Sequence, residues 1–205
     1  MVDWARLSQL LPATPLRVVS ISLLFYGINS VKDVYIVAEG VGLPAGTERA
    51  TINLANMLVE TYRVTIVVAD EAVPYYSLSE KVNVHSLGIG RLDGATRRHQ
   101  WVKLFFIELR RFLRDKHAYA LIGTNFVANC SLSILCLSLW FKPHRLLFCE
   151  HAPYLFYSPI RRLLRLFLYR GGGVVVALTP QDADAYKRKM LKAVCIPNSI
   201  SQIRE

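Results

Sequence analysis

The sequence has little cysteine, and what it has is not arranged as in the usual metal or disulfide motifs. Its four cysteines form no CxxC pair and show no Cys/His spacing typical of a zinc site; they are Cys130, Cys136, Cys149 and Cys195. Each lies in an apolar run, where a reduced cysteine behaves as a small hydrophobic side chain. The pattern disfavours a disulfide-stapled scaffold and predicts a reducing, cytoplasmic compartment.

Long hydrophobic runs are also missing. The best candidate, Leu16–Ile28, has 13 residues including Arg17, whereas a membrane span requires about 20 apolar residues. The stretch also fits a cleaved signal peptide poorly, because its basic region is a single arginine behind two prolines. There is no internal repeat or low-complexity tract, and a composition that is 53% hydrophobic excludes a disordered chain.

Acidic residues are few as well. The 205 residues carry 25 Lys and Arg against 15 Asp and Glu, a formal net charge of +10. Such an excess favours polyanionic partners, namely nucleic acid, anionic lipid or phosphorylated substrates. We do not expect nucleic acid, because the aromatic residues do not alternate with lysines on any predicted strand face.

From residue 33 onward, short β-branched segments alternate with longer segments of helical period. This alternation is typical of βαβ units and a parallel sheet. The predicted strands are Asp33–Ala38, Arg63–Ala69, Val82–Leu87, Tyr119–Gly123, Arg145–Cys149, Val174–Leu178 and Ala193–Ile196. The predicted helices are Thr47–Tyr62, His99–Lys116, Phe126–Trp140, Ser158–Arg170 and Pro180–Leu191. Right-handed crossovers between them predict an α/β fold, a Rossmann-like doubly wound parallel sheet.

Ligands of such sheets bind beyond the carboxyl ends of the strands. The first strand ends in the loop Glu39–Gly46, whose glycines allow close backbone approach. The helix that starts at Thr47 offers free N–H groups and a positive dipole end. The loop therefore suits an anion or phosphate. It is equally compatible with a plain turn, because its spacing is neither G-x-G-x-x-G nor a P-loop.

A carboxylate and a histidine follow each other at the end of the fifth predicted strand. Glu150 and His151 could bind a sugar hydroxyl or perform acid/base chemistry at the ligand-binding edge. The alternative is a loop in which the histidine is held by a structural hydrogen bond. Tyr154 and Tyr157 could stack on a ligand or donate a hydrogen bond to it, or they could be buried aromatics.

The segment Asp182-Ala183-Asp184 has the D-x-D form of a metal motif in some sugar transferases. It falls in the first turn of a predicted helix, where residues i and i+2 diverge around the axis. The preceding Thr179 and Pro180 are typical of an N-cap and a first-turn proline. We therefore predict a helix cap and no metal site.

Two predicted helices carry much of the basic charge. In the first, six apolar residues share one face, and Lys103, Arg110, Arg111 and Arg114 lie mostly away from it. The second, Ser158–Arg170, combines apolar residues at helical spacing with four arginines. Either the apolar faces pack in the core and the arginines face solvent, or the helices lie on an anionic membrane. For the apolar face of the first helix we expect core packing.

Three segments carry motifs in a recognisable order. AGTERATINLANMLVETYRVTIVVAD (Ala45–Asp70) contains a glycine, an acidic residue, an "NLA" helix and a "VT-apolar" strand. CEHAPYLFYSPIRRLLRLFLYRGGGVVVALTPQDADAYKRK (Cys149–Lys189) contains an "EH" loop, a basic helix and a "V-x-LT" strand, and Ile196–Ile200 contains "IPN". In this order, and over about residues 33–200, they resemble the N-terminal domain of family 4 retaining glycosyltransferases.

The resemblance implies the N-terminal half of a GT-B architecture, in which two Rossmann-like domains enclose the active site. This half would hold a glycan or lipid-linked acceptor, and the other half a nucleotide diphosphate sugar as donor substrate, with no cofactor and no D-x-D metal. By position, His151 matches the "EH" histidine near the transferred sugar, with Glu150 supporting it as the second candidate catalytic residue. Gly46 matches a glycine whose backbone approaches donor phosphate or acceptor, and Thr47 and Glu48 match the start of the first helix.

The resemblance also divides the chain. Residues 1–31 are a leader of unknown role, 32–200 the acceptor-side domain, and 201–205 the start of an interdomain linker without a donor domain after it. The family's E-x7-E pair is absent, since no two of the eight glutamates are eight positions apart.

We therefore expect a glycosyltransferase domain that serves envelope polysaccharide assembly, peripheral on the inner face of the cytoplasmic membrane. The alternative is a catalytically inactive product, or a subunit that requires a separate donor-domain chain.

Overall fold

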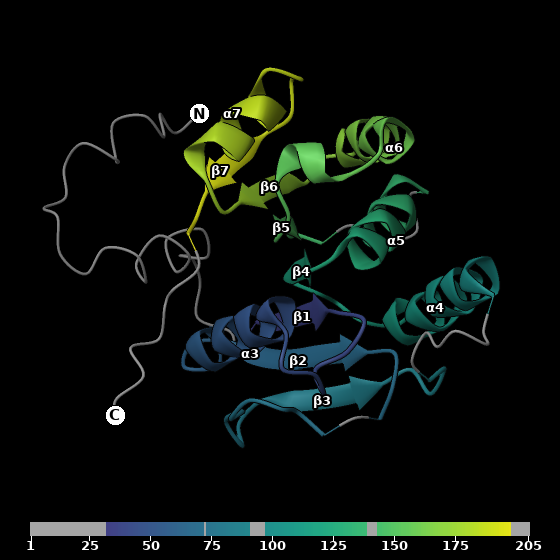
Figure 1. The fold of residues 1–205 in the computed structure, drawn as a ribbon. Helices are drawn as coiled ribbons and strands as arrows, with labels where there is room; N and C mark the ends of the chain where they lie inside the picture. The colour runs from purple at the N-terminus through teal and green to yellow at the C-terminus, as the bar shows by residue number, and fades with distance from the viewer. Residues whose placement is uncertain (1–31, 72, 91–96, 139–142, 198–205) are drawn as a thin grey trace, which may run out of the picture.

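The structure of the protein, a computed structural model, describes residues 32–71, 73–90, 97–138 and 143–197 (Figure 1). The leader 1–31, the predicted linker 201–205 and the predicted helix end at Trp140 lie outside the described residues. So does most of the "IPN" segment, from Asn198 onward.

Seven strands in the described part of the chain form one parallel sheet in the order β3-β2-β1-β4-β5-β6-β7. They are β1 (Asp33–Val37), β2 (Arg63–Val68), β3 (Asn83–Ser86), β4 (Ala120–Gly123), β5 (Arg145–Glu150), β6 (Val174–Ala177) and β7 (Ala193–Cys195). Val34 of β1 pairs with Val64 on one side and with Ala120 on the other. The strand order therefore reverses between β1 and β4.

Helices cover both faces of this sheet. They are α3 (Gly46–Leu58), α4 (Arg98–Leu113), α5 (Phe126–Leu137), α6 (Pro159–Tyr169) and α7 (Pro180–Lys187), with a short 3-10 helix η1 (Tyr154–Phe156). Alternate residues of a strand point to opposite faces. Val34 and Ile36 accordingly pack with α3, whereas Tyr35 and Val37 belong to the core formed with α4, α5, α6 and α7. The predicted α/β fold, a Rossmann-like doubly wound sheet, is confirmed.

Caps and backbone angles set where the helices begin and end. The Asn125 side chain accepts the Ala128 N–H at 2.8 Å and starts α5. The Thr179 hydroxyl accepts the Asp182 N–H at 3.1 Å ahead of Pro180, which confirms the predicted cap of α7. That helix ends at Lys187 rather than at the predicted Leu191, and Met190 then takes a left-handed φ of 63°.

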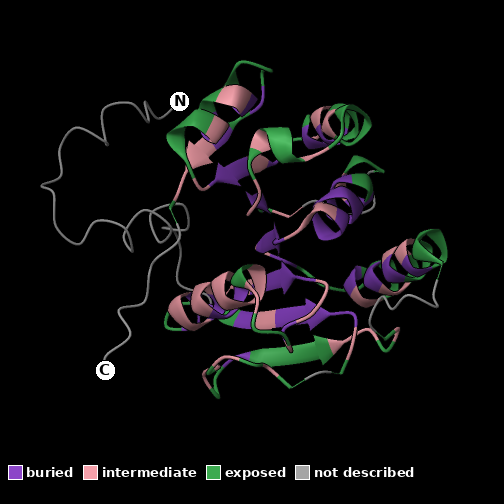
Figure 2. Ribbon diagram, viewed as in Figure 1, coloured by how far each residue is buried: buried purple, intermediate pink, exposed green. Residues whose placement is uncertain are grey.

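The two basic helices pack in opposite ways. In α4 the residues Phe105, Leu109 and Leu113 are buried, so the expected core packing is confirmed. For α6 the core-packing alternative is wrong, because Arg165 is buried and most of the apolar residues are exposed. Much of the ribbon of α6 is accordingly coloured as exposed in Figure 2. None of the described helices is both long and apolar enough to cross a membrane.

Candidate functional site

The reversal between β1 and β4 brings several predicted site segments to one edge of the sheet. The Thr124 N–H donates to the carbonyl of Val37 at 3.1 Å, and this bond joins the ends of the two strands. The Ala69 N–H donates to the Glu39 carbonyl at 3.2 Å, so the end of β2 is tied to the loop after β1. Such a reversal point is where ligands of doubly wound sheets bind.

The loop after β1 leads directly into α3, whose first turn contains Gly46, Thr47 and Glu48. Ala45 is the N-cap residue, and its own side chain makes no capping hydrogen bond. The first N–H groups of a helix have no partner within the helix. Gly46 is exposed, and no described atom lies within 4 Å of the place that a Cβ would take. The predicted approach of a ligand to Gly46 is thus sterically open.

Asp70 faces the same loop from the end of β2. A Cβ on Gly40 would lie 3.5 Å from its Oδ1 atom, which is buried and has no hydrogen-bond partner among the described residues. An acidic group at this place suits a hydroxyl or an amine better than a phosphate.

Glu150 ends β5 with its carboxylate turned into the protein, at 3% exposure. Nη2 of Arg165 lies 2.6 Å from Oε2, and the Tyr169 hydroxyl donates to Oε1 at 2.5 Å. Asn129 also donates to Oε1, at 3.2 Å. The carboxylate is fully engaged inside the protein and does not face solvent.

Sequence reasoning missed the partners of Glu150. Arg165, at 1% exposure, lies between aromatic rings, 4.4 Å from the Tyr157 centroid and 5.3 Å from that of Tyr186. Burial and the Glu150 charge raise the pKa of Tyr169 well above 10, so its hydroxyl stays protonated as a donor. A signal was present, since Arg165 and Tyr169 are four residues apart on one face of α6.

His151 follows Glu150 at the rim and is half-buried. Its Nδ1 atom is buried and has no hydrogen-bond partner in the part of the chain that the structure describes. Burial lowers the pKa of His151 below its ordinary value of 6.5, so the ring is neutral at pH 7. A neutral imidazole can both accept and donate a hydrogen bond, as binding to a sugar hydroxyl requires.

Tyr154 lies in η1, where α7 fixes it. Its N–H donates to Oδ1 of Asp182 at 2.7 Å, and its ring meets the Tyr186 ring edge-on at 5.1 Å. Asp182 also accepts the Thr179 hydroxyl at 2.7 Å, whereas Asp184 pairs with Lys187 at 3.2 Å. The two aspartates therefore hold different partners, in agreement with a helix cap. Among the described residues, no three His, Cys, Asp or Glu side chains are placed to hold a metal.

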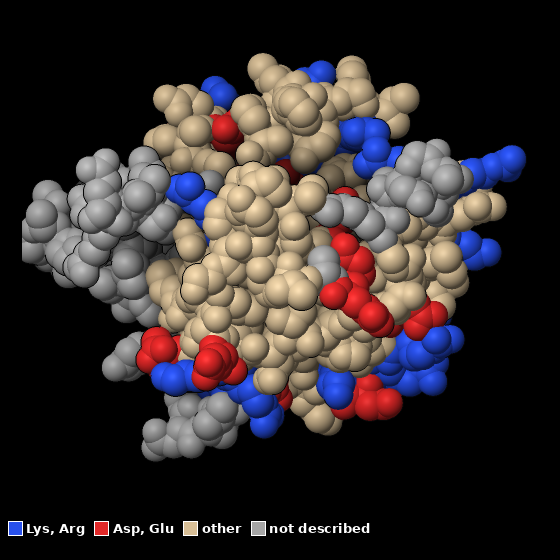
Figure 3. Space-filling view, turned by 60° about the horizontal axis from the view of Figure 1, so that its bottom comes forward, with Lys and Arg blue, Asp and Glu red and all other residues tan. Residues whose placement is uncertain are grey.

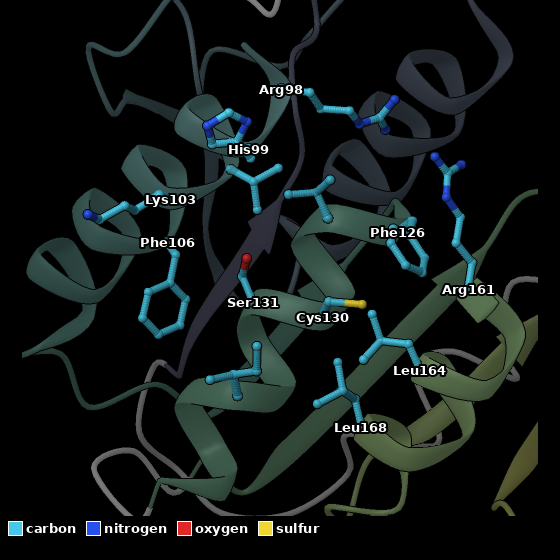
Figure 4. A pocket seen from close by; sticks show the side chains of 13 residues that line it. Arg98, His99, Lys103, Phe106, Phe126, Cys130, Ser131, Arg161, Leu164 and Leu168 are labelled. Carbon is cyan, nitrogen blue, oxygen red and sulfur yellow. The ribbon is translucent and has the colours of Figure 1, made fainter.

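A groove that the sequence analysis did not identify lies between α4, α5 and α6, with a volume of about 450 Å³ (Figure 4). Its walls are mainly apolar and include Phe106, Phe126 and Leu168. Basic side chains line it as well: Arg98, His99, Lys103 and Arg161. In Figure 4 the guanidinium groups of Arg98 and Arg161 point toward each other across one end of the groove.

Charge is distributed unevenly over the surface. On the face shown in Figure 3, acidic and basic side chains lie mostly around a broad area without charge.

The sequence matches no protein-family model, and no curated protein matches it. Among solved structures, the chain is similar to sucrose-phosphate synthase from Thermosynechococcus elongatus, with a TM-score of 0.62 and 13% identity over 81% of this chain and 48% of that one. It is also similar to Anabaena HepE in complex with UDP and glucose, with a TM-score of 0.54 and 13% identity over 82% of this chain and 44% of that one.

The chain therefore spans about half the length of these two structures. At such low identity the similarity concerns the fold alone. That fold is a Rossmann-like α/β sheet, which this chain shares with these two structures.

Proposed function

We propose that this chain forms the acceptor-side domain of a glycosyltransferase. In the proposed reaction a hexose passes from a nucleotide diphosphate sugar to a glycan or lipid-linked acceptor. The observation that carries the proposal is His151, whose ring is half-buried at the ligand-binding edge and whose Nδ1 atom has no hydrogen-bond partner among the described residues. The likeness in fold to a protein solved with UDP and glucose supports it.

The roles of the other residues follow from their positions. His151 would hydrogen-bond a hydroxyl of the acceptor or of the transferred sugar, and the fixed carboxylate of Glu150 would hold the end of β5 in place. The first turn of α3, with Gly46, Thr47 and Glu48, would receive a phosphate or the acceptor at its free N–H groups. Tyr154, held by Asp182, would form part of the wall.

Replacement of His151 by alanine tests the proposal. We expect His151→Ala to lower sugar transfer by roughly 100-fold or more, the usual contribution of a positioned acid/base group. Transfer from UDP-glucose, UDP-galactose and GDP-mannose would be measured with the protein as its native cell produces it, and with that cell's membranes as acceptor source. The exposed His117 supplies a matched control, His117→Ala. Wild-type transfer by the His151→Ala protein with an intact fold would refute the role of His151.

The alternative is a non-catalytic subunit that acts with a separate donor-domain chain. Both proposals are compatible with the coverage of less than half of each of the two neighbours. The intact mass of the native protein distinguishes the two proposals. A mass near 23.2 kDa, together with a co-purified donor-domain chain, would support the subunit, and about twice that mass would support a single enzyme chain.

A further inference from the structure

α6 is built with its apolar side outward. Ile160 is 80% exposed, Leu163 and Phe167 are each 70% exposed, and Leu164 borders them; we call these four residues the α6 stripe. Leu155 and Phe156 of the adjoining η1 are exposed as well. Folded proteins expose single apolar side chains routinely, but a contiguous group of this kind marks a surface that contacts something else.

The stripe cannot turn inward without a large loss of stability. The opposite side of α6 is anchored by Arg165, which is paired with Glu150 at 2.6 Å and lies over the ring of Tyr157. Rotating the helix to bury the stripe would leave the Glu150 carboxylate unpaired in the interior, and a buried unpaired charge is strongly destabilising. The outward stripe is therefore a fixed property of the fold.

Among the described residues, the exposed charges on α6 and along the adjoining groove have one sign. α6 has no acidic residue, and Arg161 and Arg170 are exposed beside the stripe. Arg161 also lines the groove described above, together with Arg98 and Lys103, and the 13 residues that line this groove include no Asp or Glu. The two converging guanidinium groups seen in Figure 4 suit a phosphate group, next to walls that suit an acyl chain.

We propose that the α6 stripe and this groove together dock on an anionic lipid bilayer. The stripe would enter the interfacial layer, and Arg98 and Arg161 would contact lipid phosphates. A basic helix with exposed apolar residues is the typical form of an interfacial membrane contact. The inference does not depend on sugar transfer.

Vesicle binding of the full 205-residue chain tests the proposal. We expect co-sedimentation with vesicles of phosphatidylcholine and 30% phosphatidylglycerol, and little with phosphatidylcholine alone. Leu163→Gln/Phe167→Gln removes two exposed side chains of the stripe and should weaken binding at least about tenfold. Arg98→Gln/Arg161→Gln should weaken it by a similar factor and reduce its dependence on salt.

Two control proteins match these changes. Val73→Gln/Met190→Gln replaces two equally exposed apolar residues outside α6, and Lys189→Gln/Lys192→Gln removes the same net charge outside the groove. Both should bind like the wild type, and thermal unfolding should show that all four variants fold. Equal binding to neutral and anionic vesicles, or wild-type binding by the stripe variant, would overturn the proposal. The proposal would also be overturned if the wild type were a dimer and the stripe variant a monomer, because a second copy of the chain would then cover the α6 stripe.

Discussion

Glu150 and Arg165 form a buried ion pair whose partners come from β5 and α6. We expect Arg165→Met to lower the free energy of unfolding by about 3–5 kcal/mol, because it leaves the Glu150 carboxylate buried without its cation. Urea denaturation at pH 7 measures this loss. The exposed pair of Arg63 with Asp33 gives the matched control, Arg63→Met, which should lose far less. A double change, Glu150→Leu/Arg165→Met, should recover part of the loss. Equal losses in Arg165→Met and Arg63→Met would contradict the assignment.

The burial of His151 leads to a prediction about how the free energy of unfolding depends on pH. Burial lowers its pKa below 6.5, so the unfolded chain takes up a proton before the folded chain does. At pH 8 His151 is neutral in both states, so its pKa shift does not affect the free energy of unfolding. As the pH falls through 6.5 toward the lower pKa of the folded state, His151 destabilises the fold progressively. We expect the free energy of unfolding to fall less steeply from pH 8 to pH 5 in His151→Gln than in the wild type.

His117→Gln, at an exposed position, controls for the loss of a histidine as such. His85, whose pKa is also lowered by burial and by Lys116, is present in all three proteins and cancels in the comparison. Parallel profiles for His151→Gln and the wild type would show that His151 is not desolvated in solution.

The sequence located His151 and Glu150 correctly at the end of a strand, because a strand end can be read from a short apolar run. It could not show which way the Glu150 carboxylate turns. The four arginines of the predicted helix Ser158–Arg170 looked alike in the sequence, yet Arg165 alone is buried, since a carboxylate from β5 lies beneath it. Such a pairing joins residues 15 positions apart on different elements. The helical periodicity of a single segment cannot reveal a pairing of this kind.

At the level of the elements, the end of β4 packs closely against α5. A Cβ on Gly123 would lie 2.1 Å from Oδ1 of Asn129 and 3.0 Å from its backbone N. Gly123→Ala must therefore displace Asn129, whose amide donates to the Cys149 carbonyl and to Glu150. We expect a loss of about 1–3 kcal/mol in the free energy of unfolding, as for other overpacked sites.

Gly46→Ala is the control, because the space around Gly46 is open and alanine is the better helix former. It should leave stability unchanged or raise it. Calorimetry of both variants measures these changes in stability. A Gly123→Ala protein as stable as the wild type would mean that α5 does not lie as close to β4 as described.

Most elements were predictable because each carries its own signal, such as the alternation of apolar residues or the Thr179-Pro180 cap. Element ends were less predictable. The helix predicted to run to Leu191 ends at Lys187, since the chain turns through a left-handed Met190, a conformation for which the sequence shows no glycine. η1 was also missed, because the hydrogen bond from the Tyr154 N–H to Asp182 depends on a helix 28 residues later.

For the whole molecule, thiol reactivity reports on the integrity of the core. Cys130 and Cys149 lie inside it, and burial raises the pKa of each to about 12. Because the thiolate is the reactive form, we expect both to react with a disulfide reagent at pH 8 only when the domain unfolds. Mass spectrometry of the labelled peptides identifies them. All four cysteines should react in 6 M guanidinium, and rapid labelling of Cys149 in the native protein would disprove a closed core.

The overall topology was predictable from the order of strands and helices, because right-handed crossovers leave few arrangements. The groove was not predictable, since three helices contribute its walls and none of them signals it alone. Which side of α6 faces the protein is likewise decided by contacts between elements rather than by contacts within the helix.

β1 lies between β2 and β4 in the sheet, and this position has a consequence for folding during synthesis. Val34 pairs with Val64, which follows 30 residues later, but also with Ala120, which follows 86 residues later. At a synthesis rate of about 5–20 residues per second, one side of β1 waits roughly 4–17 s for its neighbour to leave the ribosome. During that interval one edge of this apolar strand is unpaired and can pair with other chains. We therefore expect nascent chains stalled before residue 120 to be retained by chaperones, and those stalled well beyond residue 150, with β4 and β5 outside the ribosome, to be released.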